Sequence, residues 1–333
     1  MLTQRKHLRL FALLLLFLAC ATISWAQSPS ENGLRKVCFI PQWSPQAQFA
    51  GYYAAKDMGF YAERGLEVEI LPGGTNNPSG PALAAGEAEF ASMFLSRGII
   101  LRSQGEPVVN VGQIVQRSGL MLVARKDSGI VAPQDLEGKT VSLWPEFEAQ
   151  PQAFFHKFDL EVNTIRQGYS MNLFLMGGVD AASAMSYNEY LTIINSGVNE
   201  EELTTFHMAD YGLNFPEDGI YCRESLLHEE PGVVRNFVQA SIEGWQYALH
   251  HPEQALDMVM KRVRRANLPS NRVHQKGMLL GMRDIIQPNE SSEHIGQMSR
   301  QTYQFVTSTL AEHGALSYIE PFEVFYDPRP SAE

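Results

Sequence analysis

Short apolar segments alternate with helix-like segments along the first two thirds of the chain. Residues 66–71, LEVEIL, alternate apolar and acidic side chains, which is typical of a strand with one exposed face. We expect further strands at 37–40, 108–114, 119–124, 140–143 and 180–185, and helices at 82–93, 149–158 and 187–196. This order of elements predicts an α/β fold with mainly parallel sheets.

Helical patterns dominate after Asp218. Apolar residues recur at helical spacing over 231–263, which begins with a proline at a position that helices tolerate, and 275–310 has a similar pattern. We expect these helices to cover one lobe, and the tail PFEVFYDPRP at 321–330 to lie on the surface. The pair His250-His251 precedes Pro252, which favours capping of a helix end over metal binding. The acidic run at 200–202 predicts a solvated helix start.

The N-terminus has the pattern of an export signal. Basic residues at 5–9 precede the apolar run 10–19, and Ser24-Trp25-Ala26 offers small residues two apart, so we expect residues 1–26 to be removed on export to the periplasm. The run is too short to span a bilayer, which takes about 20 residues. Alternatively, FLAC at 17–20 indicates a lipoprotein anchored at Cys20, although Phe17 replaces the usual leucine. We expect no spanning helix in the mature chain.

Composition and motifs exclude several functions. With 26 basic and 37 acidic residues the net charge is −11, which argues against nucleic acid and anionic membranes as partners. Cys38 and Cys222 lie in apolar strand-like runs and are expected to be buried free thiols, with a disulfide as the alternative. No GxSxG, HExxH, P-loop or CxxC motif is present, so we expect no catalytic residue, metal or cofactor.

Aromatic and polar residues follow several predicted strands. Trp43 comes directly after the first strand, Phe147 after 140–143 and Tyr187 after 180–185. Ligands of open α/β sheets bind outside the carboxyl ends of the strands, and flat rings with a few polar groups suit a planar heterocycle. Packing in the core is the alternative for each ring. The candidate ligand-binding residues are Gln42, Trp43, Gln48, Asn77, Ser92, Glu146, Phe147, Tyr187, Asn188, Glu189 and Asp218.

A glycine-rich loop, PGGTNNPSG at 72–80, follows the second predicted strand. It matches neither a dinucleotide-binding nor a P-loop spacing. Its backbone N–H groups could still bind a polar or anionic ligand at the start of the next helix, and a plain turn is the alternative.

Five blocks carry a resemblance to a known family: QWSPQAQFAGYYAAKDMGFYAERGLEVEI at 42–70, NPSGPALAAGEAEFA at 77–91, SGLMLVARKDSGIVAPQDLEGKTVSLW at 118–144, GGVDAASAMSYNEY at 177–190, and EDGIYC at 217–222. Over about 36–268 the chain resembles the periplasmic substrate-binding proteins of the nitrate, sulfonate and thiamine-precursor group, which share a family with the thiamine pyrimidine synthases.

The resemblance implies a two-lobed binding protein of type II with a ligand cleft between the lobes. Lobe one would comprise 36–117 and 215–325, including the C-terminal helices, and lobe two 118–214. In relatives that bind the thiamine pyrimidine, a tryptophan at the place of Trp43 lies against the ring. The implied partners are a small-molecule ligand and the permease and ATPase subunits of an ABC importer.

Two other functions are possible within this resemblance. The synthases build their product from pyridoxal phosphate and a histidine of their own, using a Lys-x-x-x-His pair whose places here hold Met93 and Arg97. A thioether cannot form the Schiff base, Glu148 would repel the cofactor phosphate, and only Cys222 remains of a cysteine cluster, so the binding protein is favoured. The third function is a ligand sensor that acts through a separate signalling partner.

The ligand itself stays open at this point. Aromatic rings and carboxylates suit a hydroxymethyl- or formylamino-pyrimidine better than nitrate or a sulfonate, and riboflavin-like rings are an alternative.

Overall fold

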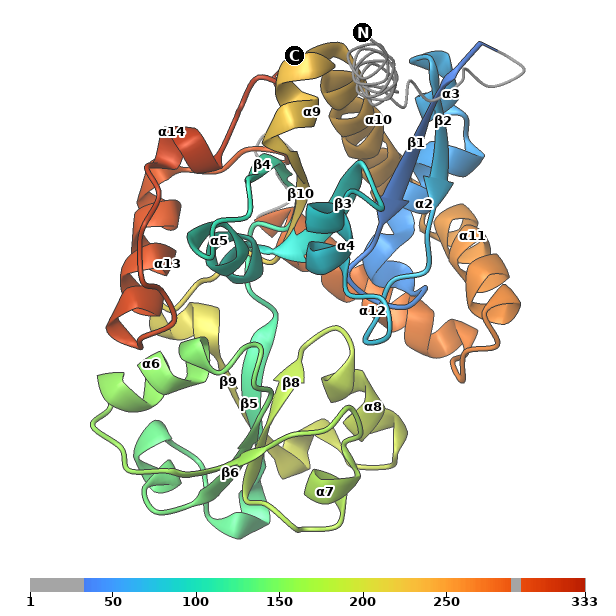
Figure 1. The fold of residues 1–333 in the computed structure, drawn as a ribbon. Coiled ribbons are helices and arrows are strands. Elements are labelled where there is room, and N and C mark those ends of the chain that lie inside the picture. The colour runs from blue at the N-terminus through green and yellow to red at the C-terminus, as the bar shows by residue number, and fades with distance from the viewer. Residues whose placement is uncertain (1–32, 289–294, 333) are drawn as a thin grey trace, which may run out of the picture.

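Two five-stranded sheets form the cores of two lobes (Figure 1). The structure is a computed structural model that describes residues 33–288 and 295–332. The first sheet has the order β2-β1-β3-β10-β4 and the second β7-β6-β8-β5-β9. The strands are β1 Arg35–Ile40, β2 Leu66–Ile70, β3 Phe90–Phe94, β4 Val108–Gln113, β5 Leu120–Arg125, β6 Thr140–Leu143, β7 Asn163–Arg166, β8 Ala181–Met185, β9 Leu203–His207 and β10 Asp218–Arg223.

The chain crosses between the lobes twice, at 114–119 between β4 and β5 and at 208–217 between β9 and β10. The strand that follows each crossing is antiparallel to both of its neighbours, so β10 pairs with β3 and β4, and β5 pairs with β8 and β9. The other strands of each sheet run parallel to one another, which confirms the mainly parallel α/β architecture. The residue limits expected for the lobes stay predictions.

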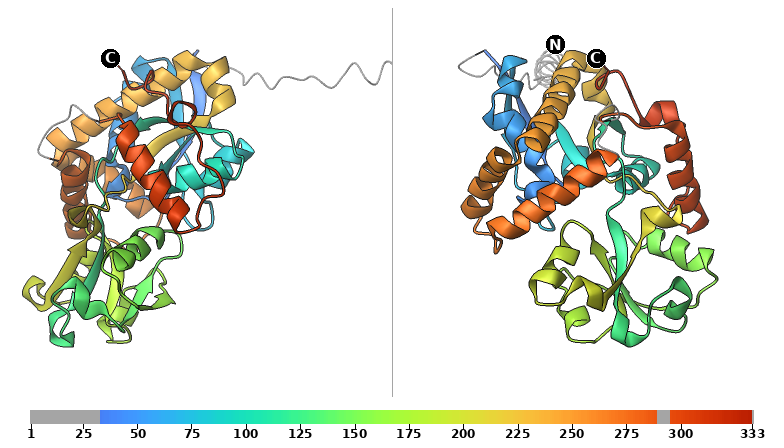
Figure 2. Two further views of the ribbon diagram at one scale, coloured as in Figure 1. Left: turned by 90° about the vertical axis from the view of Figure 1, so that its left-hand side faces the viewer. Right: turned by 180° about the vertical axis from the view of Figure 1, so that it is seen from behind.

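Helices cover both lobes, and the C-terminal helices pack on lobe one (Figure 2). Lobe one carries α2 Ala50–Asp57, α3 Phe60–Glu63, α4 Ser79–Ala85, α5 Leu95–Ser103, α9 Glu224–Glu229, α10 Pro231–His250, α11 Pro252–Arg265, α12 Arg272–Ile286, α13 Arg300–Glu312 and α14 Phe322–Phe325. Lobe two carries α6 Ala149–Lys157, α7 Asn172–Leu175 and α8 Glu189–Asn195. Helix α12 also contacts α8, and α13 contacts α6, so two C-terminal helices reach the second lobe.

The long helix α10 packs closely on α2 in the core of lobe one. The Trp245 side chain is 1% exposed, and a Cβ atom at Gly51 would lie 2.2 Å from its ring. A Cβ at Gly244 would lie 2.2 Å from the carbonyl oxygen of Gly51. Only glycine at both positions permits this approach, because any side chain would collide with backbone or indole atoms.

Three expected elements differ from the structure. The segment 82–93 is not one helix: α4 ends at Gly86, whose φ of 80° is left-handed, and the buried strand β3 follows. The single helix expected over 231–263 is divided at His251, because Pro252 has no N–H to continue the hydrogen-bond ladder of α10. The helix expected over 275–310 is likewise divided, into α12 and α13.

The histidine pair and the acidic run lie as expected. The His250 ring donates a hydrogen bond through Nδ1 to the carbonyl of Gln246 in the last turn of α10, at 2.7 Å. Residues Glu200–Glu202 form an exposed turn of 3₁₀-helix capped by Asn199. Cys38 and Cys222, the cysteines of the described residues, are free, which excludes a disulfide between them, but Cys38 is only half-buried.

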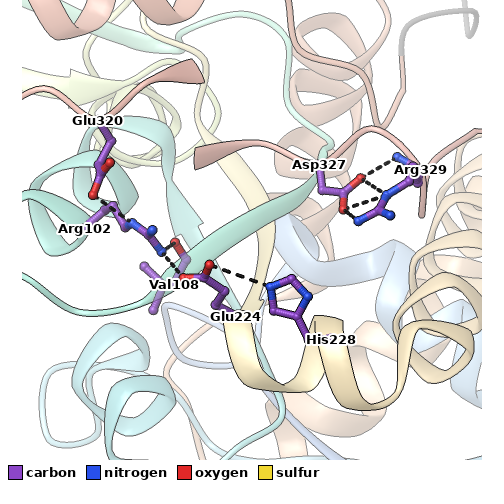
Figure 3. Close-up of polar contacts among 7 residues, drawn as sticks. All are labelled: Arg102, Val108, Glu224, His228, Glu320, Asp327 and Arg329. Atoms are coloured by element: carbon purple, nitrogen blue, oxygen red, sulfur yellow. Dashed lines mark hydrogen bonds and ion pairs between the residues drawn. The ribbon is translucent and has the colours of Figure 1, made fainter. Parts of the chain in front are cut away.

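The C-terminal tail is tied to lobe one rather than lying loosely on its surface. Phe325 and Tyr326 are buried, and Tyr326 pairs with Asn110 of β4. Figure 3 shows a second tie at Arg102, which is 9% exposed and donates from Nη1 to the Glu224 carboxylate (3.1 Å). Its Nε lies 3.5 Å from a carboxylate oxygen of Glu320. One guanidinium therefore joins α5, α9 and Glu320, the residue directly before the tail.

We expect Arg102→Gln to lower the free energy of unfolding by about 1–3 kcal/mol, because two carboxylates then lose a partly buried cation. Urea denaturation followed by circular dichroism measures this. Arg300→Gln is the control, since the Arg300–Glu323 pair is exposed and such pairs contribute under about 1 kcal/mol. Equal effects of the two substitutions would contradict the role assigned to Arg102.

Candidate functional site

A cavity of about 400 Å³ lies between the lobes, and residues from both lobes line it. From lobe one it receives the segment after β1, the loop after β2 and helix α5. From lobe two it receives the segments that follow β6, β7 and β8 (Figure 1). Of the candidate residues, the structure brings together Gln42, Trp43, Gln48, Glu146, Phe147, Tyr187, Asn188 and Glu189 on its wall. Their contact with a ligand stays a prediction.

Trp43 faces an aromatic ring of the opposite lobe. Its indole is partly exposed, and the ring of Tyr169 lies 5.2 Å away, centroid to centroid, at an interplanar angle of 50°. The backbone N–H of Gln42 donates to the hydroxyl of Ser92 on β3 (3.0 Å), which fixes the chain immediately before Trp43. A rigid strand end thus presents an aromatic face to the cavity, and a second ring faces it from lobe two.

Two glutamine side chains are held from behind by one carboxylate. Both Gln42 and Gln48 donate from Nε2 to Asp218, Gln48 at 2.7 Å, and Asp218 is 2% exposed. Burial raises the pKa of the Asp218 carboxyl well above its usual value, and the Gln48 hydrogen bond acts in the opposite direction. Each amide uses one of its two N–H groups on Asp218, and the Gln48 oxygen accepts from Nε2 of Gln46 (2.5 Å), which leaves the Gln42 oxygen as an acceptor.

Three candidates are not on the cavity wall. Asp218 lies behind the glutamines, and Ser92 uses its hydroxyl to accept from the Gln42 backbone. Asn77 donates from Nδ2 to the carbonyl of Pro72 (2.8 Å) and so closes the glycine-rich loop on itself. These residues shape the site without lining it. The loop does reach the cavity through Gly74 and Ser79, and its N–H groups stay untested as ligand donors.

Hydrogen bonding and close packing hold Tyr187 in place where the two crossings meet. Its hydroxyl donates to Oε2 of Glu217 (2.8 Å), and Oε1 of the same carboxylate accepts from the backbone N–H of Gly119 (2.6 Å). A Cβ atom at Gly119 would lie 2.9 Å from the Tyr187 ring, and one at Gly281 of α12 would lie 2.8 Å from its Cβ. Burial raises the pKa of Glu217 to about 7.

A polar chain links lobe two to helix α12. Glu189 accepts from the N–H of Met185 (3.0 Å) and from Nδ2 of Asn188 (2.8 Å), and Nε2 of His274 donates to Oδ1 of Asn188 (2.9 Å). Burial raises the pKa of Glu189 to about 7 and lowers the pKa of His274. The carboxyl group can therefore exchange a proton near neutral pH.

Several residues of the wall are not among those predicted from the sequence. Tyr169 follows β7, and the rule that selected Phe147 and Tyr187 would have found it if that exposed edge strand had been predicted. Trp144 lies at the end of β6 and donates from Nε1 to the Gly168 carbonyl (3.1 Å). Met93 and Arg97, discussed above only for the synthase chemistry, both line the cavity.

The side chains of this cavity can bind a ligand through aromatic rings, amides and carboxylates. Arg97 and Glu146 are exposed to it and have no hydrogen-bond or ion-pair partner among the described residues. Within 33–288 and 295–332, no group of three histidine, cysteine, aspartate or glutamate side chains is placed to hold a metal ion. No lysine lies on the wall, so no side chain there can form an imine.

Two lobes joined by two crossings, with a cavity between them, define a binding protein fold of type II. The chain belongs to the NMT1/THI5-like family, whose model matches residues 46–255. A solved structure of the periplasmic aliphatic sulphonate binding protein SsuA from Escherichia coli superimposes with a TM-score of 0.66 at 16% identity, covering 88% of this chain and 92% of that one. In the described part of the chain, no helix has the length and apolar character needed to cross a membrane.

Curated relatives include both binding proteins and enzymes. The chain is 24% identical to a formylaminopyrimidine-binding protein of Halalkalibacterium halodurans (92% of this chain, 94% of the relative) and 27% identical to a riboflavin-binding protein of Chloroflexus aurantiacus (72% and 71%). It is 22% identical to a 4-amino-5-hydroxymethyl-2-methylpyrimidine phosphate synthase of Legionella pneumophila (67% and 72%). The family alone therefore does not decide between binding and catalysis.

Protonation of Glu217 should make stability depend on pH. The folded protein keeps a proton on this carboxyl up to about pH 7, whereas the unfolded chain loses it near pH 4.5. The stabilisation is therefore fully present below pH 4.5 and is lost as pH rises through 7, by on the order of 3 kcal/mol. Urea denaturation between pH 4.5 and 8 measures the slope.

Glu217→Gln removes the titrating group and should make the free energy of unfolding fall less steeply over this range. Part of the slope should remain, because Glu189 titrates in the same direction. Glu202→Gln is a control at an exposed turn. An unchanged slope in Glu217→Gln would show that Glu217 is ionised throughout the range.

Proposed function

We propose that the protein is an exported solute-binding protein of an ABC importer and that it binds a small planar nitrogen heterocycle such as an aminopyrimidine. The observation that carries this proposal is the contact between Trp43 and Tyr169, two rings from opposite lobes that meet at 50° on the cavity wall. A flat ligand can stack on such rings while amides and carboxylates contact its edge. The relatives that bind a formylaminopyrimidine and riboflavin support the same ligand class.

The polar groups of the wall favour a ligand that donates hydrogen bonds. Glu146 and Glu189 are acceptors when ionised, and Gln42 and Gln48 each use one of their two amide N–H groups on Asp218. An aminopyrimidine donates from its amino group and is uncharged at neutral pH. A sulfonate or nitrate would instead need donors, and Arg97 is the single cation among the lining residues.

A synthase function is disfavoured by the same wall. The positions of its imine-forming lysine and donor histidine hold Met93 and Arg97, and the thioether and guanidinium there lack the required reactivity. Export would also separate the protein from the cytoplasmic cofactor. The export signal expected at 1–26, with the lipid anchor at Cys20 as its alternative, lies outside the described residues. Docking to permease and ATPase subunits belongs to this proposal.

The stacking contact is tested at Trp43. We expect Trp43→Ala to weaken binding of 4-amino-5-hydroxymethyl-2-methylpyrimidine at least tenfold, because the ligand loses a stacked ring and buried area. Trp43→Phe should lose less, since a ring remains. Isothermal titration calorimetry measures both variants. Unchanged affinity in Trp43→Ala would mean that this indole does not contact the ligand.

The charge preference is tested with a matched pair of substitutions. Glu146→Gln should weaken the pyrimidine about three- to tenfold, because a carboxylate accepts a hydrogen bond about twice as strongly as a neutral amide. Arg97→Gln, at the same wall, should leave its affinity within about twofold. Ethanesulfonate serves as the competing ligand class. If ethanesulfonate binds, and binds more tightly to Glu146→Gln and more weakly to Arg97→Gln, the heterocycle proposal is wrong.

A further inference from the structure

A second cavity, of about 480 Å³, adjoins the first on the side of the crossings. It is bounded by the start of α6 in lobe two, the end of α13, and residues 215–217 of the second crossing. The two cavities share the residues Phe94, Arg97, Glu146, Phe147 and Met185. Because these side chains belong to both walls, the two spaces are neighbours across a single partition.

The partition is an aromatic contact between the lobes. Phe94 ends β3 of lobe one and Phe147 follows β6 of lobe two, and their ring centroids are 4.8 Å apart at an interplanar angle of 38°. Phe147 is partly exposed and belongs to a segment without regular structure, and Trp144 meets its ring edge-on at 6.4 Å. An arm of a ligand stacked at Trp43 would reach the second cavity by displacing the Phe147 ring from Phe94.

The second cavity offers hydrogen-bonding groups of a different kind from the first. Its own residues include Ser96, Gln152 and His313, which can both donate and accept. Its exposed carboxylates are Glu146 and Glu148, against one arginine, so an anionic group would meet more repulsion than attraction. The lining suits a polar group that is uncharged or positively charged.

The volumes also exceed the needs of one six-membered ring. Cavities of about 300–1,000 Å³ enclose ligands of drug size, and here two such spaces adjoin. Resting on the proposed function, we infer that the ligand has two parts: a flat ring in the first cavity, and a polar, non-anionic arm that passes Phe147 into the second. Ala149 and Gln152 line only the second cavity and so report on the arm alone.

The probes are 4-amino-5-hydroxymethyl-2-methylpyrimidine, a bare ring, and thiamine, which joins the same ring type to a cationic second ring with a hydroxyethyl chain. Thiamine monophosphate adds an anionic end. Calorimetric titration of the full mature chain should show thiamine binding at least tenfold more tightly than the bare ring, and thiamine monophosphate binding more weakly than thiamine.

Filling the second cavity should remove this advantage. Ala149→Phe should weaken thiamine about tenfold or more and leave the bare ring within twofold. Gln152→Leu keeps the side-chain size and removes hydrogen bonding, so it should weaken thiamine binding about threefold. It replaces Ala149→Phe as the test if circular dichroism shows that Ala149→Phe is not folded. Trp43→Ala should weaken both probes by a similar factor.

The outcomes separate this inference from the proposed function. If the bare ring binds and depends on Trp43, but thiamine binds no more tightly or ignores both second-cavity substitutions, the arm is refuted and the proposed function stands. If thiamine monophosphate binds most tightly, the arm is anionic and the inference is wrong. If neither probe binds the wild-type protein, the proposed ligand class fails, and this inference with it.

Discussion

Two adjacent buried carboxyl groups, Glu217 and Asp218, hold the cavity walls of both lobes in place. They stand where the second crossing enters β10, and each is 2% exposed. Glu217 accepts from the first crossing at Gly119 and from Tyr187 of lobe two, whereas Asp218 accepts from Gln42 and Gln48 of lobe one. Burying such carboxyl groups is costly unless hydrogen bonds satisfy them. The groups that donate to Glu217 and Asp218 are therefore held in place.

In this arrangement, some residues hold the cavity wall in place and other residues line the cavity. The carboxyl groups lie behind the wall and accept from Gln42, Gln48 and Tyr187, which holds these side chains in place. Ser92 and Asn77 act in the same way, through the backbone before Trp43 and through the closure of the glycine-rich loop. A wall fixed from behind loses little conformational entropy when it binds a ligand, which is the advantage of preorganisation.

Much of the fold could be predicted because its strands have local signatures. LEVEIL alternates, and the strands at 120–125 and 181–185 are nearly continuous apolar runs. β3 was mistaken for helix because Phe90–Phe94 contains alanine and methionine, and its burial between β1 and β10 outweighs local propensity. The short strand β7 is exposed and carries no apolar pattern. The sequence therefore predicts neither β7 nor the position of Tyr169 after it.

The part of the site that follows one rule, that ligands bind at the carboxyl ends of the strands, was predictable from the sequence. Aromatic residues at the carboxyl ends of strands were found from order along the chain, and eight of the candidate residues meet at one cavity. Which polar residues face the ligand and which support them from behind depends on side-chain direction across two lobes, and sequence spacing does not contain that information. Asp218 illustrates this, because its position in the chain matches a wall residue but its burial makes it a support.

The same fold occurs in binding proteins and in enzymes, so the function of this chain depends on the side chains of its cavity rather than on its architecture. This wall presents the thioether of Met93 and the guanidinium of Arg97, and neither group is suited to forming an imine or giving up ring atoms. The remaining polar groups are carboxyl groups and amides that hold and orient. A cavity with these groups can bind a ligand through stacking and hydrogen bonds, and it places no lysine where an imine with that ligand could form.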